Sequence, residues 1–374
     1  MQINISEPCI GKEELSAVKI PLKTGWVSQG PIVKKFEDEF AKKHNVKYAF
    51  AVSSGTTALH TALLALEIGP GDEVIVPSFT WVASANAVLY CGATPVLVDI
   101  ELNSFNLDPT RLAKAITKKT KAIIAIHLFG QSADIDKIKE IAPDIAIVED
   151  AACAAGGRYK GENIGSIGDV ACFSFHPRKI ITTGEGGMIT TNNNDIGKKI
   201  TSLRNHGLSY SSHQIGSPEY MGEVLMLGYN FRMTDIQAAI GIEQLKKLEN
   251  FIAHRTTLVN YYYEFLRDLK WLEMPQAAGD VLHSWQAFVC LVNTDKSPIS
   301  RNELMRILSK NNISTRPGTH AIHTLDYYKQ RFGYSENQFP NALLAQNCSI
   351  ALPLHNNLRK KDIEVISSTI KSIS

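Results

Sequence analysis

VKYAFAVSSGTTALHTALLAL, residues 46–66, begins as an apolar strand and passes through a turn of small residues directly into a helix. The same alternation continues to residue 152 through EVIVPSF and TWVASANAVLY, TPVLVDI and DPTRLAKAIT, KAIIAIHLFG and ADIDKIKEIA, and finally IAIVEDAA. Near-continuous apolar strands separated by helices are typical of a mostly parallel sheet that carries helices on both faces. These residues therefore predict an α/β domain.

The pattern changes further along the chain. DVACFSF and GMITTN read as two more strands, joined by the loop HPRKIITTGEG rather than by a helix. A long amphipathic helix follows, with Thr234 and Asp235 as N-cap candidates. SWQAFVCLV, SRNELMRILSKNN and KDIEVISSTIKSI come after it. We expect a large α/β domain over residues 1–245 and a smaller C-terminal α+β domain over residues 246–374, because 374 residues exceed one ordinary core.

Composition narrows the function classes. The chain carries 39 Lys and Arg against 37 Asp and Glu, a net charge of +2, so no overall field favours nucleic acid or an anionic membrane. No apolar run reaches the roughly 18 residues of a membrane span, and the N-terminus has no leader-like pattern. The 6 cysteines form no C-x-x-C pair, so neither a disulfide framework nor a metal site is indicated. We expect a cytoplasmic protein.

Two strand ends carry polar residues where an open sheet binds ligands. At the start of one helix, Gly55 and Thr56 offer free backbone N–H groups that suit a phosphate. An ordinary Ser/Thr N-cap explains the same residues, and it is the commoner case. The strand IAIVED ends in Glu149 and Asp150, which alternation sends to opposite faces, and we choose Asp150 for the site. A helix N-cap is the alternative for that residue.

A third strand end holds a lysine. In FSFHPRKIITTGEGG, residues 173–187, Lys179 lies between an aromatic pair with a proline and a cluster of glycines, which favour a tight, sheltered turn. A desolvated lysine has a lowered pKa and becomes a nucleophile for carbonyl groups. The alternative is a surface lysine, the usual position for this residue type.

Together these features fit pyridoxal 5'-phosphate, which requires a lysine, a carboxylate for the ring nitrogen, donors for the phosphate and a flat side chain against the ring. Lys179, Asp150 and the Gly55–Thr56 turn supply the first three. Trp81, just after another strand, supplies the fourth. Because a tryptophan suits a core position equally well, its assignment depends on the other three.

The chain resembles the DegT/DnrJ/EryC1/StrS family of pyridoxal-phosphate-dependent sugar aminotransferases, which has the type I, aspartate-aminotransferase-like fold. The likeness covers nearly the whole chain and rests on TGWVSQGPIVKKFEDEFA, SSGTTALHTAL, GDEVIVPSFTWVASANAV, GATPVLVDI, VEDAA, GDVACFSFHPRKIITTGEGGM, LRNHG, GYNFRMTDIQAAIG and ALPLH. The resemblance implies that Lys179 forms the internal aldimine and that Asp150 pairs with the pyridinium nitrogen. It also implies the remaining contacts to the cofactor, from Trp81 to the ring and from Gly55, Thr56 and Ser174 to the phosphate.

The resemblance further implies a homodimer, in which Asn230 of the motif GYNFRMTD reaches the phosphate in the neighbouring subunit's site. Two positions depart from the family pattern. Cys153 stands where relatives have glutamine or histidine beside the cofactor, and since a thiol is a weak donor we expect altered tuning of the cofactor. TRPGTHAIH, residues 315–323, replaces a His-Tyr-x-Pro-x-His type of segment, so Arg316 and His320 become candidates for substrate binding, unless the histidines cap local backbone.

The function that the resemblance implies is the transfer of an amino group from an amino acid, by family precedent L-glutamate, to a nucleotide-linked keto-deoxysugar by a ping-pong mechanism, with a 4-keto sugar favoured over a 3-keto sugar. Relatives that dehydrate such sugars carry histidine in place of Lys179. Amination of a cyclitol ketone, sugar dehydration and a non-catalytic cofactor-binding regulatory module are the alternatives, and Lys179 together with Asp150 argues against the module. The arginines at 178, 204, 232 and 316 are candidates for substrate phosphates, although surface ion pairing explains any one of them as well.

Overall fold

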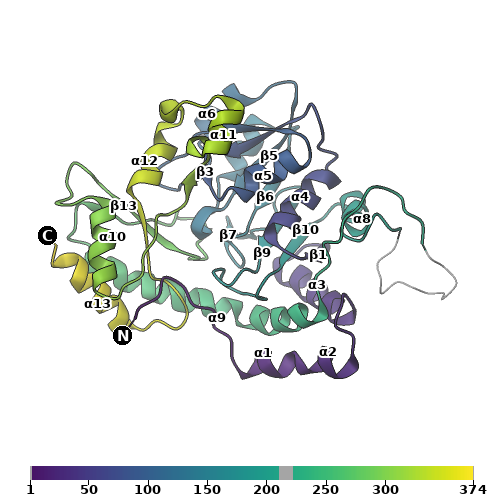
Figure 1. Cartoon of the computed structure of the whole chain (residues 1–374), viewed down its shortest axis with the longest axis horizontal. Coiled ribbons are helices and arrows are strands. Elements are labelled where there is room, and N and C mark those ends of the chain that lie inside the picture. Colours follow the sequence, from purple (N-terminus) through teal and green to yellow (C-terminus); the bar gives the residue numbers. More distant parts are fainter. Residues whose placement is uncertain (1, 210–221, 374) are drawn as a thin grey trace.

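The large sheet of the protein has seven strands, and the computed structural model describes residues 2–209 and 222–373. From one edge to the other the strands are β1 (Tyr48–Val52), β10 (Gly187–Thr191), β9 (Val170–Ser174), β6 (Ala146–Asp150), β5 (Thr120–Ile126), β2 (Glu73–Pro77) and β4 (Thr94–Val98) (Figure 1). The five strands from β9 to β4 are mutually parallel, whereas β10 is antiparallel to both β9 and β1. The predicted α/β fold with a mostly parallel sheet is confirmed.

Helices cover both faces of this sheet. One face carries α4 (Gly55–Ala65), α5 (Ala83–Tyr90) and α8 (Asn194–Leu203), and the other carries α3 (Pro31–His44), α6 (Pro109–Ala115), α7 (Ile135–Ile141) and α9 (Asp235–Leu266). Strand β2 shows the alternation directly, because Val74 and Val76 pack under α4 and α5 while Ile75 packs under α6 and α7. Two short helices, α1 (Lys12–Ala17) and α2 (Lys19–Thr24), lie along α9.

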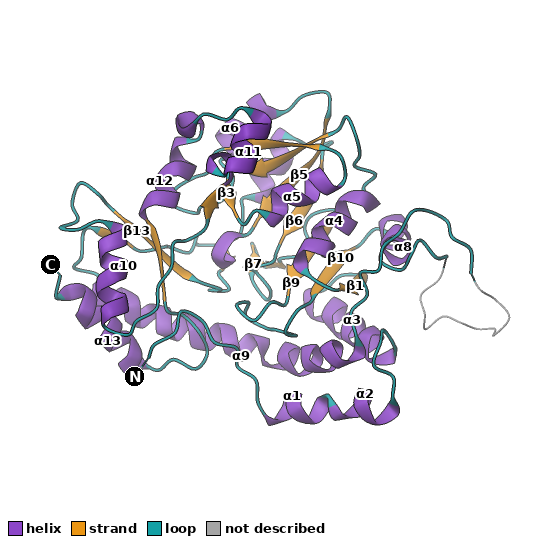
Figure 2. Cartoon of the chain, viewed as in Figure 1, coloured by secondary structure: helices purple, strands orange, loops and turns teal. Residues whose placement is uncertain are grey.

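The C-terminal residues build a second core around a sheet of β11 (Leu272–Glu273), β13 (Phe288–Val292) and β15 (Ser349–Leu352), with α10 (Arg301–Lys310) and α13 (Lys360–Lys371) (Figure 2). Helix α9 joins the two cores: Leu245 and Leu248 pack with α3, whereas Leu258 and Tyr262 pack with the C-terminal sheet. We therefore propose that the boundary between the two domains, at 245/246, falls inside a continuous helix.

Two short strand pairs connect the C-terminal residues back to the large part. Strand β14 (His320–Ala321) pairs with β3 (Phe79–Thr80), and β12 (Val281–Leu282) pairs with β7 (Arg158–Tyr159), which also pairs with β8 (Glu162–Asn163). The remaining elements are α11 (Asp326–Phe332), α12 (Pro340–Cys348) and the short 3-10 helices η1 (Leu128–Gly130), η3 (Ile322–Thr324) and η4 (Glu336–Gln338). None of the helices in the described part of the chain has the length and hydropathy that crossing a membrane requires.

The two predicted N-cap candidates of α9 have different roles. Thr234 is the N-cap, because its hydroxyl oxygen accepts the Gln237 amide at 3.2 Å. The buried carboxylate of Asp235 instead accepts the amides of Gly30 (2.9 Å), Ile32 (3.2 Å) and Val33 (2.9 Å) at the start of α3. Asp235 therefore caps a helix about two hundred residues away in sequence and ties α3 to α9.

Replacing Asp235 with alanine leaves the first amides of α3 without their buried acceptor. We expect the Asp235→Ala variant to lose about 2 kcal/mol of unfolding free energy, since a cap and a charge-assisted hydrogen bond are both removed. Urea denaturation followed by circular dichroism measures this loss. The matched control is Asp195→Ala at the exposed start of α8, which should change the stability by less than about 0.5 kcal/mol. Equal stability of the two variants would contradict the cap.

Candidate active site

A cavity of about 380 Å³ opens at the carboxyl ends of β6 and β9, where the C-terminal residues close over the large sheet. The end of β6 supplies Asp150, and the end of β9 supplies Ser174. The C-terminal part of the chain also lines the cavity, through Gln286, Arg316 and residues of β15. Ligands of open parallel sheets bind at this edge, because the strand ends of neighbouring units meet there.

Lys179 extends into the cavity from the loop between β9 and β10. The loop is held by backbone contacts, including the Lys179 amide to the His176 carbonyl at 2.8 Å and the Thr182 hydroxyl to the Phe175 carbonyl at 2.7 Å. The Lys179 amine donates to the Cys153 sulfur at 3.2 Å. Among the described residues no ion pair involves Lys179, so the amine lies in the cavity without a carboxylate partner. Such an amine is available to condense with a carbonyl group.

Asp150 is 6% exposed and its carboxylate is held by two donors. The Ser84 hydroxyl donates to one carboxylate oxygen at 2.7 Å, and the Ala152 amide donates to the other at 3.2 Å. Ser84 lies on α5 and was not identified from the sequence, since a serine inside a helix carries no signal of its own. The two donors hold the carboxylate in one orientation beside the cavity.

The start of α4 forms another wall of the cavity. The N-cap interpretation is correct, because the Ser54 hydroxyl oxygen accepts the Thr57 amide at 3.1 Å. Ser54, Gly55 and Thr56 nevertheless line the cavity as well, and the first amides of a helix have no acceptor within it. A Cβ on Gly55 would lie 2.8 Å from the Cβ of Ser174, so glycine is needed for the helix to approach the end of β9. This corner suits an oxyanion.

Four further predicted residues differ in where they lie relative to the cavity. Trp81 lines the cavity, is 52% exposed, and its ring centroid lies 5.7 Å from that of His320. His320 therefore contacts a cavity residue without being one of the lining residues. Arg316 does line the cavity, and its carbonyl accepts the Ala351 amide at 2.8 Å. Asn230 is exposed and lies outside the cavity of its own chain.

The structure shows which of the four candidate arginines line the cavity. Arg204 is buried in an ion pair with Glu37, and Arg232 donates to the Asn205 side chain at 2.6 Å. Arg178 and Arg316 remain in the cavity. The sequence alone could not show which arginines are engaged elsewhere, because the partners of Arg204 and Arg232 are distant from them in the chain.

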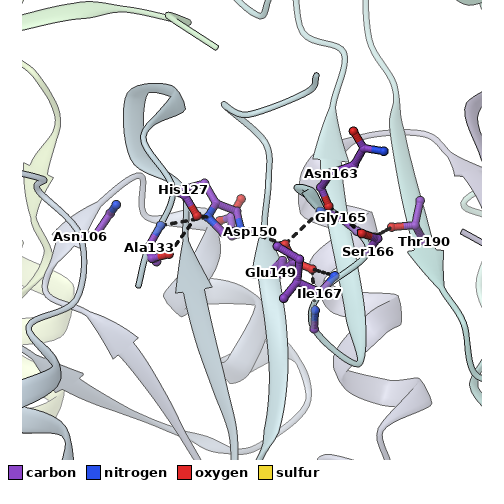
Figure 3. Close-up of polar contacts among 12 residues, drawn as sticks. Asn106, His127, Ala133, Glu149, Asp150, Asn163, Gly165, Ser166, Ile167 and Thr190 are labelled. Carbon is purple, nitrogen blue, oxygen red and sulfur yellow. Dashed lines mark hydrogen bonds and ion pairs between the residues drawn. The ribbon is translucent and has the colours of Figure 1, made fainter. Parts of the chain in front are cut away.

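Glu149 lies on the opposite side of β6 from Asp150, as strand alternation predicts, and is fully buried (Figure 3). It accepts hydrogen bonds from His127 Nε2 (3.0 Å) and from the amides of Gly165 (2.9 Å), Ile167 (2.9 Å) and Gly168 (2.7 Å). Because His127 Nδ1 accepts the Ala133 amide at 3.1 Å, the ring proton is on Nε2. Burial alone raises the pKa of the Glu149 carboxyl, but these donors outweigh it and hold the pKa below the usual 4.5.

The residues in the cavity fit pyridoxal phosphate. The described residues provide an amine without an ionic partner, a buried and oriented carboxylate, and a helix start that glycine brings against Ser174. Groups of three or more His, Cys, Asp or Glu that could hold a metal ion are absent from the described ranges. Fold and site together define a type I pyridoxal-phosphate enzyme.

The family model of the DegT/DnrJ/EryC1/StrS aminotransferase family matches residues 8–371, and the chain belongs to this family. It is 40% identical over 377 residues to the spore coat polysaccharide biosynthesis protein SpsC of Bacillus subtilis, covering 98% of this chain and 96% of that protein. Its structure matches Spr1654 of Streptococcus pneumoniae in the pyridoxal phosphate form with a TM-score of 0.92 and 31% identity, over 100% of this chain and 98% of that one. The Escherichia coli enzyme GDP-4-keto-6-deoxy-D-mannose-3-dehydratase matches with a TM-score of 0.91 and 28% identity, over 99% of both chains. The protein is a pyridoxal-phosphate-dependent sugar aminotransferase.

Replacing Glu149 with glutamine directs an amide NH₂ toward backbone donors in a buried site. We expect Glu149→Gln to lose about 3 kcal/mol of unfolding free energy at neutral pH. Since the folded pKa is lowered, the stabilisation by Glu149 is complete above the ordinary pKa of 4.5 and is lost as the pH falls below it through the folded value. Urea denaturation at several pH values should therefore show a smaller decline below pH 4.5 in the variant. The exposed Glu303→Gln serves as the control and should lose stability below pH 4.5 as the wild type does. If the stability of Glu149→Gln fell as steeply as that of the wild type, this account would be contradicted.

Proposed function

We propose that the enzyme transfers the amino group of L-glutamate to a nucleotide-linked 4-keto-deoxysugar by a ping-pong mechanism. The observation that supports this most is that the Lys179 amine, which is in no ion pair among the described residues, lies in one cavity with the buried Asp150 carboxylate. A binding module requires neither a proton shuttle nor an anchored electron sink, so this pair favours catalysis.

When bound, pyridoxal phosphate supplies an aldehyde that condenses with amines and a ring that withdraws electrons from the reacting carbon. Lys179 would hold the cofactor through its Nζ, and once an amino acid had taken its place this amine would carry the proton that leaves the substrate carbon. Asp150, oriented by Ser84, would hold a proton on the ring nitrogen. Gly55, Thr56 and Ser174 would hold the phosphate, while Trp81 would cover the ring.

Cys153 would lie beside the ring, where its thiol already contacts the Lys179 amine. A thiol donates a weaker hydrogen bond than the glutamine or histidine that relatives carry. We propose that the cofactor is therefore tuned differently in this enzyme, while Lys179 and Asp150 keep the reaction intact.

The substrate class is supported by the relatives. SpsC is named for polysaccharide biosynthesis, and the name of the Escherichia coli relative contains a GDP-linked 4-keto sugar.

We place the enzyme in the cytoplasm. All 6 cysteines, which lie within the described residues, are free, as is usual in that reducing compartment.

We further propose a homodimer in which Asn230 reaches the neighbouring site. Asn230 is exposed, and Val224 (69% exposed), Leu225 (58%) and Leu227 (82%) precede it in the same segment. A group of exposed apolar side chains is typical of a surface that another protein covers. Here the proposed cover is a second copy of the chain.

Sugar dehydration is the second candidate, and the likeness to the Escherichia coli dehydratase favours it. Lys179 argues for amination, because the dehydratases carry histidine at this position. The mass of the product separates the two reactions, since amination and dehydration change the mass of the keto sugar in different ways. Product mass also reveals amination of a cyclitol ketone instead.

The half-reaction with glutamate tests the role of Lys179. Adding glutamate to the wild-type holoenzyme should replace the absorbance of the pyridoxal form by that of the pyridoxamine form. Lys179→Ala should slow this conversion by about 10²–10⁴-fold, because the group that moves the proton is lost. Lys198→Ala, an exposed lysine paired with Asp195, is the control. If Lys179→Ala converted at the wild-type rate, the proposed role of Lys179 would be contradicted.

Mixed dimers test the position of Asn230. A subunit with Lys179→Ala is combined with a subunit that has Asn230→Ala, and the two are purified together by different tags. If Asn230 crosses to the neighbouring subunit, one site of the mixed dimer carries both changes and the other carries neither. We therefore expect about half of the wild-type activity, from one intact site in two. Activity no higher than that of the two parent variants would show that Asn230 acts within its own chain.

A further inference from the structure

The Cys153 thiol and the Lys179 amine are in contact inside the active-site cavity. The amine donates to the sulfur at 3.2 Å, and both residues line the cavity. Both are half-buried, so a small molecule in the cavity can reach them. Thiols and amines are both nucleophiles, and the two lie here at the distance from which a bond between them can form once one is oxidised.

Fixed backbone holds the two side chains in this contact. The Cys153 carbonyl accepts the Ser284 hydroxyl at 3.0 Å, and the Lys179 amide donates to the His176 carbonyl at 2.8 Å. Ile180, which follows the lysine, is buried. Because a lysine side chain is a flexible four-carbon stem, its amine can approach the sulfur more closely without a change in the backbone.

The other cysteines of the chain are placed differently. Cys9 is half-buried like Cys153, but it does not line the cavity. The remaining thiols are buried, and burial raises their pKa, which disfavours the thiolate that oxidants attack; they are Cys91, Cys172, Cys290 and Cys348. Cys153 is therefore the thiol that combines access from the cavity with a neighbouring amine.

We propose that Cys153 is a site of reversible oxidation by a peroxide, and that the oxidised sulfur forms a covalent bridge to the Lys179 nitrogen. The peroxide oxidises the thiol to a sulfenic acid and is itself reduced to water. The lone pair of the nitrogen then attacks the sulfur: an S–N bond forms, the S–O bond breaks, and the hydroxyl leaves as water with a proton from the nitrogen. The product is a sulfenamide.

Small thiols reverse the bridge. One thiol attacks the Cys153 sulfur, the S–N bond breaks, and the Lys179 nitrogen takes up the proton of that thiol. A second thiol then displaces Cys153 from the mixed disulfide and leaves as the disulfide of the small thiol. In a reducing compartment the bridge therefore lasts only while peroxide is present.

The bridge occupies the amine that the cofactor requires. While Lys179 is bonded to the cofactor, its nitrogen is not free to attack the sulfur, so the loaded enzyme is protected. Without cofactor, the lysine is exposed to the reaction. This consequence goes beyond the proposed function but rests on the role that it gives Lys179, whereas the bridge itself rests on the contact of the two side chains.

Peptide mass spectrometry of the full-length enzyme tests the bridge without any variant. The enzyme, either freed of cofactor or loaded with pyridoxal phosphate, is treated with hydrogen peroxide and digested without a reducing agent. In the cofactor-free enzyme we expect the peptides of Cys153 and Lys179 to be joined, with a mass two hydrogen atoms below their sum, and dithiothreitol should separate them. Unjoined peptides in this sample would overturn the proposal, and equal joining in the loaded enzyme would overturn the protection by the cofactor.

Two variants separate oxidation of the thiol from capture by the amine. Lys179→Ala should keep a sulfenic acid on Cys153, which dimedone traps, because the attacking amine is lost. Cys153→Ser should form no bridge, whereas the matched control Cys9→Ser, at the other half-buried thiol, should form it as the wild type does. If dimedone labelled Cys153 as strongly in the wild type as in Lys179→Ala, the amine would not capture the sulfur and the proposal would be wrong.

Cofactor binding gives a second readout that does not require turnover. After oxidation, the cofactor-free enzyme should fail to regain the absorbance of the bound pyridoxal form, and dithiothreitol should restore it. A bridged enzyme that still bound the cofactor normally would contradict the role of Lys179 and not the bridge. Failure of the glutamate half-reaction would likewise contradict the proposed function, while the joined peptides still decide the bridge.

Discussion

The register between β6 and β9 determines which acid enters the active site. Asp150 pairs with Cys172 and Glu149 with Ala171, so Asp150 faces the cavity and Glu149 faces the opposite side. A shift by one residue would exchange the two carboxylates, because strand side chains alternate between faces. The four donors around Glu149 oppose such a shift, since the displaced carboxylate would leave them unpaired in a buried site.

The cavity depends on both cores of the molecule. The large domain supplies Lys179, Asp150 and the start of α4, whereas the C-terminal residues supply Gln286 and Arg316. Helix α9 and two short strand pairs join the C-terminal residues to the large domain, and this packing brings the two sets of residues around one cavity. The proposed catalytic pair, Asp150 and Lys179, shares this cavity with Arg178 and Arg316.

Local sequence predicted the parts of the site that lie at strand ends. Lys179, Asp150 and Gly55 were expected near one another because a parallel sheet brings its strand ends to one edge, and they do line one cavity; the fold followed from the apolar alternation. Ser84 and Gln286 could not be identified, because their partners are distant in sequence. Ser84 lies in a stretch that carries the family likeness, but nothing in that stretch marks a serine as the partner of Asp150. Asp235 was a candidate N-cap of its own helix, where it is the first residue, but its carboxylate caps α3, since it binds the unpaired amides that the packing brings near. The position of Asn230 relative to the site stays a prediction, because it depends on a second chain.

The central claim is that one amine, that of Lys179, carries the cofactor over the Asp150 carboxylate. Reduction of the purified holoenzyme with borohydride fixes the cofactor covalently to the lysine that holds it, and peptide mass spectrometry then locates the modified residue. We predict a single phosphopyridoxyl group, on the peptide that contains Lys179. Modification of a different lysine, with the Lys179 peptide left unmodified, would contradict the account.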